Sequence, residues 1–532
     1  MLVSLFLRWI LIFRGGQYYF SDEQRYETSR IVADLTLHGK FSEALSQLFT
    51  APEHLGFKTI GLIPAIVEYL TRESLVIPAI FFSFFSILNL FLIYQISKRI
   101  GSSSKESLYV LFISASVMSL LYFTRHLMPY DAALTFGLSA LYFALTDKPT
   151  FKTSLACGGL SFLCFITYNG YWSLAGLAML VHVLASHLKN VTLSGASRHE
   201  GSLLPKVRDS HLHLRQVQVS VAKNAPSERH GIFEMGTSNN GKVIEILRKA
   251  YFTSLGFILP AILLFAVAMS VGINLLTEYR TFATTVSQGS YAEGWSLPFE
   301  YFWHTEHLVI VVLGLLSLYA LIESRGRTKS LNVLAAGLIF IYVCLLIPSV
   351  FLHSFVVYGR LARQMMPLLI LLSASGLVKL EQNYSYGRNI VRLVLAVIFV
   401  QAAWNYRTSY DLSYPREFAS KIQTQYPDFD FSEKRLAFGA PTLCQNNGYI
   451  IENVKYFVTP PEPNPRVQGE LLVSASHPDN FLPYQYEGYT YEQRQKFRVL
   501  NLQMRFYKAD SKFMPESNPN WISMKGCVVK EN

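Results

Sequence analysis

Long apolar blocks recur along the chain, and short polar segments separate them. A helix needs about 20 residues to cross ~30 Å of hydrocarbon, and most of the blocks approach this length. The pattern predicts about eleven transmembrane helices, at residues 2–14, 75–95, 107–124, 131–146, 153–168, 171–187, 251–276, 306–322, 331–352, 364–380 and 390–404. The first block is short and contains Arg8, so it is either an interfacial segment or a span whose arginine faces the bundle.

Three longer polar segments interrupt this pattern. Residues 15–74 form a loop between the first two spans, and residues 188–250 predict a partly disordered insert rich in Ser, His, Gly and Asn. Residues 405–532 combine Pro-rich turns with β-like runs at 470–475 and 497–504. We therefore expect an all-α polytopic membrane domain over 1–404, followed by a small soluble α+β or mainly β domain.

The composition supports a membrane protein. Hydrophobic residues make up 51% of the chain and charged residues 16%, against about 25% charged in ordinary soluble proteins. This excludes a purely soluble enzyme, a disordered chain and a disulfide-stapled secreted domain. Cys157, Cys164 and Cys344 lie in apolar blocks and are expected in the core. Cys444 and Cys527 share the C-terminal region, where a disulfide is an open alternative to free thiols.

The excess of positive charge predicts an orientation. The chain has 47 Lys and Arg against 36 Asp and Glu, a net charge of +11, but no nucleic-acid-binding motif accompanies it, so nucleic acid is not an expected partner. Basic residues follow the second, fourth, sixth and eighth spans, which share one side if the spans alternate. The positive-inside rule makes that side cytoplasmic. We expect a cytoplasmic N-terminus, an external C-terminus and a bacterial inner membrane.

The first external loop holds the most informative polar segment. Residues 21–26, Ser-Asp-Glu-Gln-Arg-Tyr, match a capping box, apolar positions continue at helical spacing, and Gly39 is expected to end the helix. A second amphipathic stretch covers 41–48, and both helices are expected to lie on the outer membrane surface. Asp22 and Glu23 would either complement the helix dipole or serve chemistry at that surface.

Further candidate residues occur at the predicted external ends of other spans. The turn before the fourth span contains Arg125 and Asp131, and the segment entering the tenth span contains Tyr358, Arg360 and Arg363. Arginine and tyrosine at span ends are also ordinary interfacial anchors, so either reading is open for each of them.

The predicted loop 277–304 offers side chains suited to a sugar or a lipid head, namely Arg280, Trp295 and His304. An aromatic belt at the membrane surface is the ordinary alternative. The spacing of the histidines and the acid in 304–307 matches no zinc motif. We therefore expect no cofactor, with a divalent metal ion as the less favoured alternative.

Three segments together resemble a family. Asp-Glu-x-Arg-Tyr at 22–26, after a first span and before a membrane-surface helix, resembles the GT-C class of membrane glycosyltransferases. Within that class, the nearest in pattern are the lipid A aminoarabinose transferases and the protein O-mannosyltransferases. Residues 125–131 are similar to the family's short external turn, and residues 360–367 resemble its Arg-x-x-x-Pro segment. Relatives often place a cation where this chain has 167–171, Thr-Tyr-Asn-Gly-Tyr, so another residue would have to contact a phosphate here.

The resemblance implies an enzyme that takes a sugar from a polyprenyl-phosphate donor by a single inverting displacement on the external, periplasmic face. The acceptor would be a hydroxyl or phosphate of a glycan, lipid or protein. An attacking hydroxyl needs a carboxylate base, for which Asp22 is the first choice, with Glu23 orienting it and Asp131 as a second carboxylate. The donor phosphate needs cations. The residues implied for it are Arg363, Arg360, Arg125 and Tyr358, and those implied for other substrate contacts are Arg25, Tyr26, Arg280, Trp295 and His304.

A secondary transporter or lipid flippase for glycolipids is the competing function. Such a protein places ionisable residues near the bilayer midplane, often beside broken helices. Only Arg8 and His182 lie inside the predicted spans and away from their ends, which favours chemistry at the membrane surface. A non-catalytic scaffold that displays the C-terminal domain would explain neither the acidic loop nor the arginines.

Overall fold

The computed structural model describes residues 1–13, 25–50, 52–71, 76–146, 149–196, 239–286, 295–324, 329–352 and 359–410, and seven short strands beyond residue 433. The helices are α1 (Leu2–Phe13), α2 (Arg25–Leu37), α3 (Phe41–Phe49), α4 (Leu55–Thr71), α5 (Val76–Arg99), α6 (Ser104–Ser116), α7 (Tyr130–Ala144), α8 (Phe151–Thr167), α9 (Trp172–Ala196), α10 (Asn239–Ser270), α11 (Leu275–Val286), α12 (Leu297–Glu306), α13 (Leu308–Ser324), α14 (Lys329–Leu346), α15 (Met366–Asn383) and α16 (Gly387–Tyr410). Shorter helical turns are η2 (Met118–Leu120), η3 (Tyr122–Arg125), η4 (Asn169–Tyr171), η5 (Ile347–Phe351) and η6 (Gly359–Met365).

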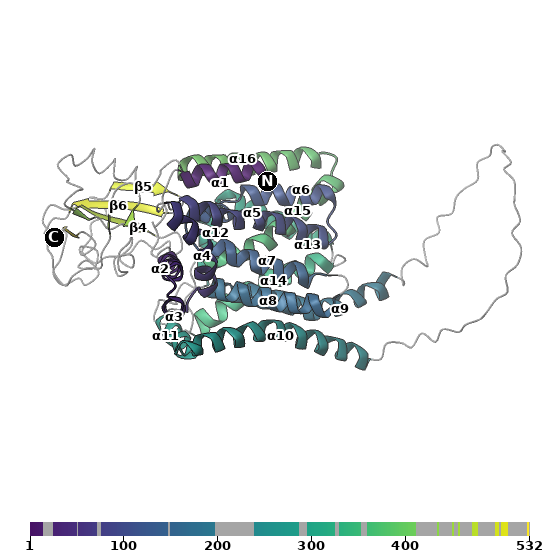
Figure 1. Ribbon diagram of the computed structural model, residues 1–532. Coiled ribbons are helices and arrows are strands. Elements are labelled where there is room, and N and C mark those ends of the chain that lie inside the picture. The colour runs from purple at the N-terminus through teal and green to yellow at the C-terminus, as the bar shows by residue number, and fades with distance from the viewer. Residues whose placement is uncertain are drawn as a thin grey trace, which may run out of the picture.

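The described helices form a bundle of roughly parallel and antiparallel rods (Figure 1). Within the described residues, five helical segments are long and apolar enough to cross a membrane: Val76–Arg99, Val243–Ser270, Ser330–Phe351, Leu361–Asn383 and Gly387–Tyr406. A sixth span is obtained if the bent pair α6 with η2 and η3 is one span. The chain is therefore an α-helical polytopic membrane protein. Every predicted apolar block contains a helix, whereas eleven as the number of membrane crossings stays a prediction.

The bundle has two different ends. Helices α2, α3, α4, α11 and α12 gather at one end, with the strands beyond it, while α9 ends and α10 begins at the other (Figure 1). A separate apolar cluster holds the first of these ends together, and it includes Val32 of α2, Phe49 of α3, Leu55 of α4 and Leu275 of α11. We call this end the loop-helix end and the other the α9–α10 end. The predicted external segments thus share one end.

The loop 15–74 is helical where it is described. Helices α2 and α3 confirm the periodicity read from the sequence, and Gly39 between them has a φ of 76°. This left-handed conformation is readily adopted only by glycine, and it lets the amide N–H of Lys40 donate to the carbonyl of Leu35. Helix α4 follows and packs on α2, because Gly61 leaves room for the Ser29 hydroxyl, 2.5 Å from where a Cβ would lie.

Two further segments are more helical than the sequence predicted. The stretch 277–304 was expected to be a loop, but α11 and α12 occupy much of it. Helix α11 forms because Leu275 and Tyr279 lie one turn apart on one face: Leu275 is buried, and the Tyr279 hydroxyl donates to the carbonyl of Pro52 over 3.2 Å. Both ends of the expected insert 188–250 are also helical, since α9 runs to Ala196 and α10 starts at Asn239.

The strands beyond residue 433 are β1 (Lys434–Arg435), β2 (Ile450–Ile451), β3 (Tyr456–Phe457), β4 (Leu471–Ser476), β5 (Gln495–Val499), β6 (Leu502–Lys508) and β7 (Val529–Lys530). Strand β4 confirms the run predicted at 470–475. The run predicted at 497–504 is also extended, but it is divided between β5 and β6, with a reversal where Val499 pairs with Leu502. Strands β4, β6 and β5 form an antiparallel sheet in that order. A single folded C-terminal domain stays a prediction.

Candidate functional site

A broken helix lies at the centre of the candidate site. Helix α6 ends at Ser116, and η2 and η3 continue at an angle of 73° to it. Pro129 then precedes α7, and proline disfavours helical geometry in the residue before it. A break leaves backbone N–H and C=O groups without intrahelical partners. In an apolar interior each of these groups must find a partner within the protein, and here the side chains of Glu306, Arg8 and Arg363 supply several of them.

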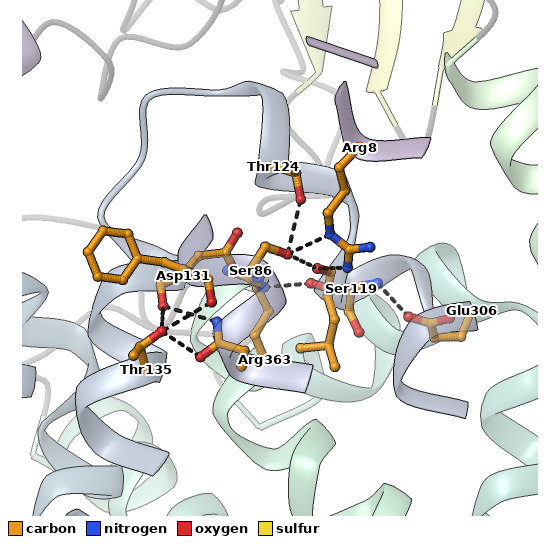
Figure 2. Close-up of polar contacts among 11 residues, drawn as sticks. Arg8, Ser86, Ser119, Thr124, Asp131, Thr135, Glu306 and Arg363 are labelled. Carbon is orange, nitrogen blue, oxygen red and sulfur yellow. Dashed lines mark hydrogen bonds and ion pairs between the residues drawn. The ribbon is translucent and has the colours of Figure 1, made fainter. Parts of the chain in front are cut away.

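Glu306 and Arg8 bind the backbone of η2 from two sides (Figure 2). The Glu306 carboxylate accepts the amide N–H groups of Met118 and Ser119, with N···O distances of 3.0 and 2.7 Å. Arg8 donates from Nε to the Ser86 hydroxyl over 2.9 Å and from Nη2 to the carbonyl of Leu120 over 3.5 Å. Arg8 is 1% exposed. Of the two alternatives for the first block, α1 is therefore the helix whose arginine faces the bundle.

Arg363 is held on the same segment by two of its three nitrogens. Its Nε donates to the carbonyl of Ser119 and its Nη2 to Oδ1 of Asp131, both over 2.6 Å. The guanidinium also lies over the rings of Phe123 and Tyr130, at 5.1 and 5.9 Å from their centroids. The side chain is fully buried, and its Nη1 has no hydrogen-bond partner among the described residues. Arg363 thus keeps one unused donor nitrogen, which is buried inside the bundle.

Asp131 is placed by α5 as well as by its own helix. Its backbone carbonyl accepts from Nδ2 of Asn89 over 3.0 Å and from the Thr135 hydroxyl over 2.9 Å. Its side chain is 8% exposed and paired with Arg363. This pairing gives Asp131 the geometry of a residue that positions a cation.

The depth of this site corrects the sequence analysis, which placed Arg125 and Asp131 in a short turn at the membrane surface. Asn89, which contacts Asp131, lies near the middle of α5, and Arg125 in η3 is fully buried. The physical reason is length. Helices α6 and α7 have 13 and 15 residues, which span only ~20 Å at ~1.5 Å per residue, so the turn between them lies inside the bundle.

A row of aromatic rings connects the loop-helix end to Arg363. His54, just before α4, stacks on Tyr168 with ring centroids 5.0 Å apart. Tyr168 contacts Tyr130 at 4.8 Å and Tyr171 at 5.1 Å, and Tyr130 lies under the Arg363 guanidinium. These tyrosines belong to the segments 167–171 and 125–131 singled out in the sequence. Aromatic side chains, rather than a cation, therefore occupy the 167–171 segment.

Two buried charged groups of α4 face α2 and the segment before α4. Glu68 accepts hydrogen bonds from the Tyr26 hydroxyl and from Nε of Arg30, both over 3.1 Å. Lys58 is 1% exposed and lies 3.8 Å from a carboxylate oxygen of Glu53. Burial lowers the pKa of Lys58 to about 8, although the Glu53 carboxylate acts in the opposite direction. The sequence analysis missed Lys58 and Glu68. Each is a single charged residue within the apolar run 55–71, and this isolation could have identified them.

The other predicted site residues are distributed as follows. Asp22, Glu23 and Tyr358 lie outside the described residues, and for Arg360 and His304 only the backbone is described, in η6 and α12. Arg25 begins α2, Tyr26 is fully buried against Glu68, Arg280 is exposed on α11, and Trp295 is 58% exposed just before α12. Of the predicted set, the structure brings together Arg363 and Asp131, with Arg125 in the adjoining turn.

Glu306 lies in the segment 304–307, where a metal ion was the less favoured alternative, and its side chain accepts hydrogen bonds from two backbone amides. Among the residues whose side chains are described, no group of three His, Cys, Asp or Glu could hold a metal ion. Cys157 and Cys164 are fully buried free thiols, which confirms their expected place in the core, whereas the free thiol Cys344 is only half-buried. Cys444 and Cys527 lie outside the described residues.

No family model matches the chain, and no curated protein matches it. Among solved structures, the chain is similar to an oligosaccharyltransferase from Archaeoglobus fulgidus, in a complex with Zn and sulfate, at 11% sequence identity and a TM-score of 0.40. The similarity covers 80% of this chain and 55% of that one, so this chain spans about half the length of that structure. A likeness of this strength does not assign an activity.

Proposed function

We propose that the chain is an integral membrane glycosyltransferase that moves a sugar from a polyprenyl-phosphate donor to an acceptor on the external face. The observation that carries the proposal is Arg363. Its guanidinium is fully buried and fixed by Asp131 and Ser119, and its Nη1 has no partner among the described residues. A preorganised cation in a water-poor site stabilises charge that develops on a leaving phosphate far better than one in water.

In the proposed reaction, the acceptor oxygen attacks the anomeric carbon, and the bond from that carbon to the phosphate oxygen breaks. The phosphate leaves with the electron pair next to Arg363, with Arg125, Arg360 and Tyr358 as further contacts. The acceptor proton passes to the carboxylate of Asp22, with Glu23 beside it, as the sequence resemblance implies. Asp131 positions Arg363, because its Oδ1 accepts a hydrogen bond from Nη2 of that guanidinium.

The resemblance also suggests the setting of the reaction. The acceptor would be a hydroxyl or phosphate of a glycan, lipid or protein, and the arginines would supply the positive charge at the phosphate. The loop-helix end would face the periplasm of a bacterial inner membrane, with the N-terminus in the cytoplasm. Arg25, Tyr26, Arg280, Trp295 and His304 are the further residues proposed for substrate contact. Of these, Arg280 and Trp295 are exposed near the loop-helix end and suit a polar head.

The proposal is tested by reconstituting the purified chain in nanodiscs with a panel of polyprenyl-phosphate sugars and measuring the release of polyprenyl phosphate. Asp22→Asn and Arg363→Lys are each expected to lower the rate about 10²-fold or more. Arg388→Gln, an exposed change on α16, is the control and should keep the wild-type rate. Wild-type turnover in both Asp22→Asn and Arg363→Lys would contradict the assignment.

A secondary transporter for glycolipids is the second candidate, and one observation favours it. The Arg363–Asp131 pair and Arg8 lie beside a broken helix near the middle of α5, which is the arrangement expected of a transporter substrate site. Sealed vesicles with a labelled glycolipid separate the two functions. Movement of intact glycolipid across the bilayer, without release of polyprenyl phosphate, would establish the transporter instead.

A further inference from the structure

A second polar site lies at the α9–α10 end, away from the candidate catalytic residues. A cavity of about 240 Å³ is found between the first turn of α8 and the N-terminal part of α10. Its lining includes Thr150 and Ser154 from the α8 side and Glu245, Arg248, Lys249 and Phe252 from α10. The volume is slightly below the ~300–1,000 Å³ of sites for whole drug-sized ligands. The cavity is therefore of a size for a compact polar group.

The walls of the cavity are held in place by close helix packing. Helices α8 and α10 run side by side (Figure 1), and glycines face each other between them. A Cβ on Gly158 would lie 2.0 Å from the carbonyl oxygen of Thr253, and one on Gly256 would lie 2.5 Å from that of Leu155. Nearer the cavity, the rings of Phe151 and Phe252 meet edge to face at 4.7 Å. The site is thus preformed.

The charge of the cavity favours an anion. Arg248 lies over the ring of Phe252 at 5.9 Å, and the Lys249 side chain is 7% exposed and 2.8 Å from a carboxylate oxygen of Glu245. Two cations therefore face one acid. The N-terminus of α8, capped by Thr150, adds the partial positive charge of the helix dipole. Ser154 contributes a hydroxyl, which lies 2.9 Å from Nε2 of His182.

The surface next to the cavity is apolar. Ile258, Leu259, Ile262 and Leu263 lie in the turns of α10 that follow the cavity and are each between 49% and 65% exposed. The candidate span Val243–Ser270 has only 17% of its apolar window buried within the protein. Cationic pockets between membrane helices bind the phosphate headgroups of anionic lipids, and here an exposed apolar helix face adjoins the pocket for acyl chains.

We propose that this cavity binds the phosphate of an anionic membrane lipid, with the acyl chains along α10. The lipid belongs to the leaflet at the α9–α10 end, opposite the proposed catalytic residues. The site is distinct from the glycosyl-transfer site and does not depend on it.

Binding is tested with the full chain in detergent, using short-chain phosphatidylglycerol as the probe and measuring its affinity by isothermal titration. Phosphatidylcholine of equal chain length tests the need for net negative charge, and inorganic phosphate tests whether the free anion suffices. Phosphatidylglycerol should bind at least about tenfold more tightly than either compound. Arg248→Gln and Lys249→Gln should each weaken it by about tenfold, the value of one charge-assisted contact.

The matched control is Lys152→Gln, which removes the same charge from an exposed position in the first turn of α8, outside the cavity lining. It should leave the affinity unchanged. An equal loss of affinity in Lys152→Gln would show that any surface charge has this effect, and it would overturn the proposed site. Equal affinity for phosphatidylcholine would overturn the anionic ligand, and equal affinity for inorganic phosphate would overturn the lipid.

Discussion

The Arg363–Asp131 ion pair links residues 232 positions apart within a buried site. Taking two charges out of water costs free energy, and their mutual attraction offsets this cost only while both are present. Removing one partner leaves an unpaired buried charge. The pair therefore makes the local fold depend on two side chains jointly, and a double variant separates this structural role from the proposed chemical one.

We predict that Arg363→Gln lowers the free energy of unfolding by about 3–5 kcal/mol, because Asp131 then stays buried without a counter-charge. The double variant Arg363→Gln with Asp131→Asn should recover most of this loss but none of the transferase activity. Chemical denaturation in detergent measures the first quantity, and donor turnover measures the second. Full recovery of turnover in the double variant would exclude Arg363 from the chemistry.

Lys58 gives a prediction about pH. Its pKa is lowered from 10.5 to about 8 in the folded state, so between these values the unfolded chain binds more protons and stability rises with pH. The rise should reach roughly 3 kcal/mol at the upper end of this window, as 1.36 kcal/mol per pKa unit implies.

Thermal unfolding from pH 7.5 to 10.5 should show this rise in the wild type and lose it in Lys58→Met. Lys40→Met is the control, because Lys40 is 56% exposed just before α3. A rise of the same size in Lys58→Met would assign it to other groups.

At this scale the sequence identifies residue types better than it identifies contacts. Arg363, Asp131 and Arg125 could be singled out because charges are rare near apolar blocks. Their pairing could not, since the chain between Asp131 and Arg363 includes several helices whose packing is not encoded locally. The role of Glu306 could not be predicted, because its partners are the backbone amides of a distant segment, which no sequence motif marks.

At the scale of the element, the break between α6 and η2 is the feature on which the site depends. The Glu306 carboxylate acts as a cap for η2, in the way that an acidic side chain caps the start of an ordinary helix. Because the cap is fully buried, no water can replace it.

We predict that Glu306→Gln destabilises the protein by about 1–3 kcal/mol, because the amide group presents one N–H₂ to a backbone N–H and leaves a buried donor unsatisfied. Glu43→Gln, which changes a 64% exposed acid on α3, should have little effect. The midpoint of thermal unfolding measures both. Equal midpoints in the two variants would mean that η2 does not need its cap.

Elements with a clear period were predictable and those without one were not. Helices α2 and α3 follow from apolar spacing and from Gly39, whose conformation the structure confirms. Helix α4 was read as loop because a charge and Pro64 interrupt its apolar run. The reversal between β5 and β6 could not be located within the β-like run, because apolar residues continue on both of its sides.

At the scale of the whole molecule, we predict that the loop-helix end and the α9–α10 end lie on opposite sides of the membrane. In sealed right-side-out membranes, a cysteine at Lys40 on the loop-helix end should react with a membrane-impermeant maleimide, and a cysteine at Lys152 should react only after permeabilisation. A background that lacks the native cysteines serves as the control. The reverse pattern would invert the orientation and move the proposed chemistry to the cytoplasm.

The alternation of apolar blocks and basic loops was enough to predict a helical membrane protein and to sort segments between two ends. The depth of the site within the bundle could not be predicted from the sequence. The block 107–124 looks continuous in hydropathy, because Met118, Leu120 and Leu121 are apolar whether or not they are α-helical. Only the packing of α6 and α7 against α5 shows that the chain turns back inside the bundle.

The shortness of α6 and α7 has a consequence for access. A lipid phosphate normally rests at headgroup level, about half the ~30 Å hydrocarbon thickness above the bilayer centre, whereas Arg363 lies level with the middle of α5. For a donor to reach Arg363, its phosphate must lie deeper in the bilayer than the headgroups of the surrounding lipids, or the bilayer must be thinner beside the short helices. Under the proposed function, the acceptor would likewise have to extend its reacting oxygen below headgroup level to meet the donor.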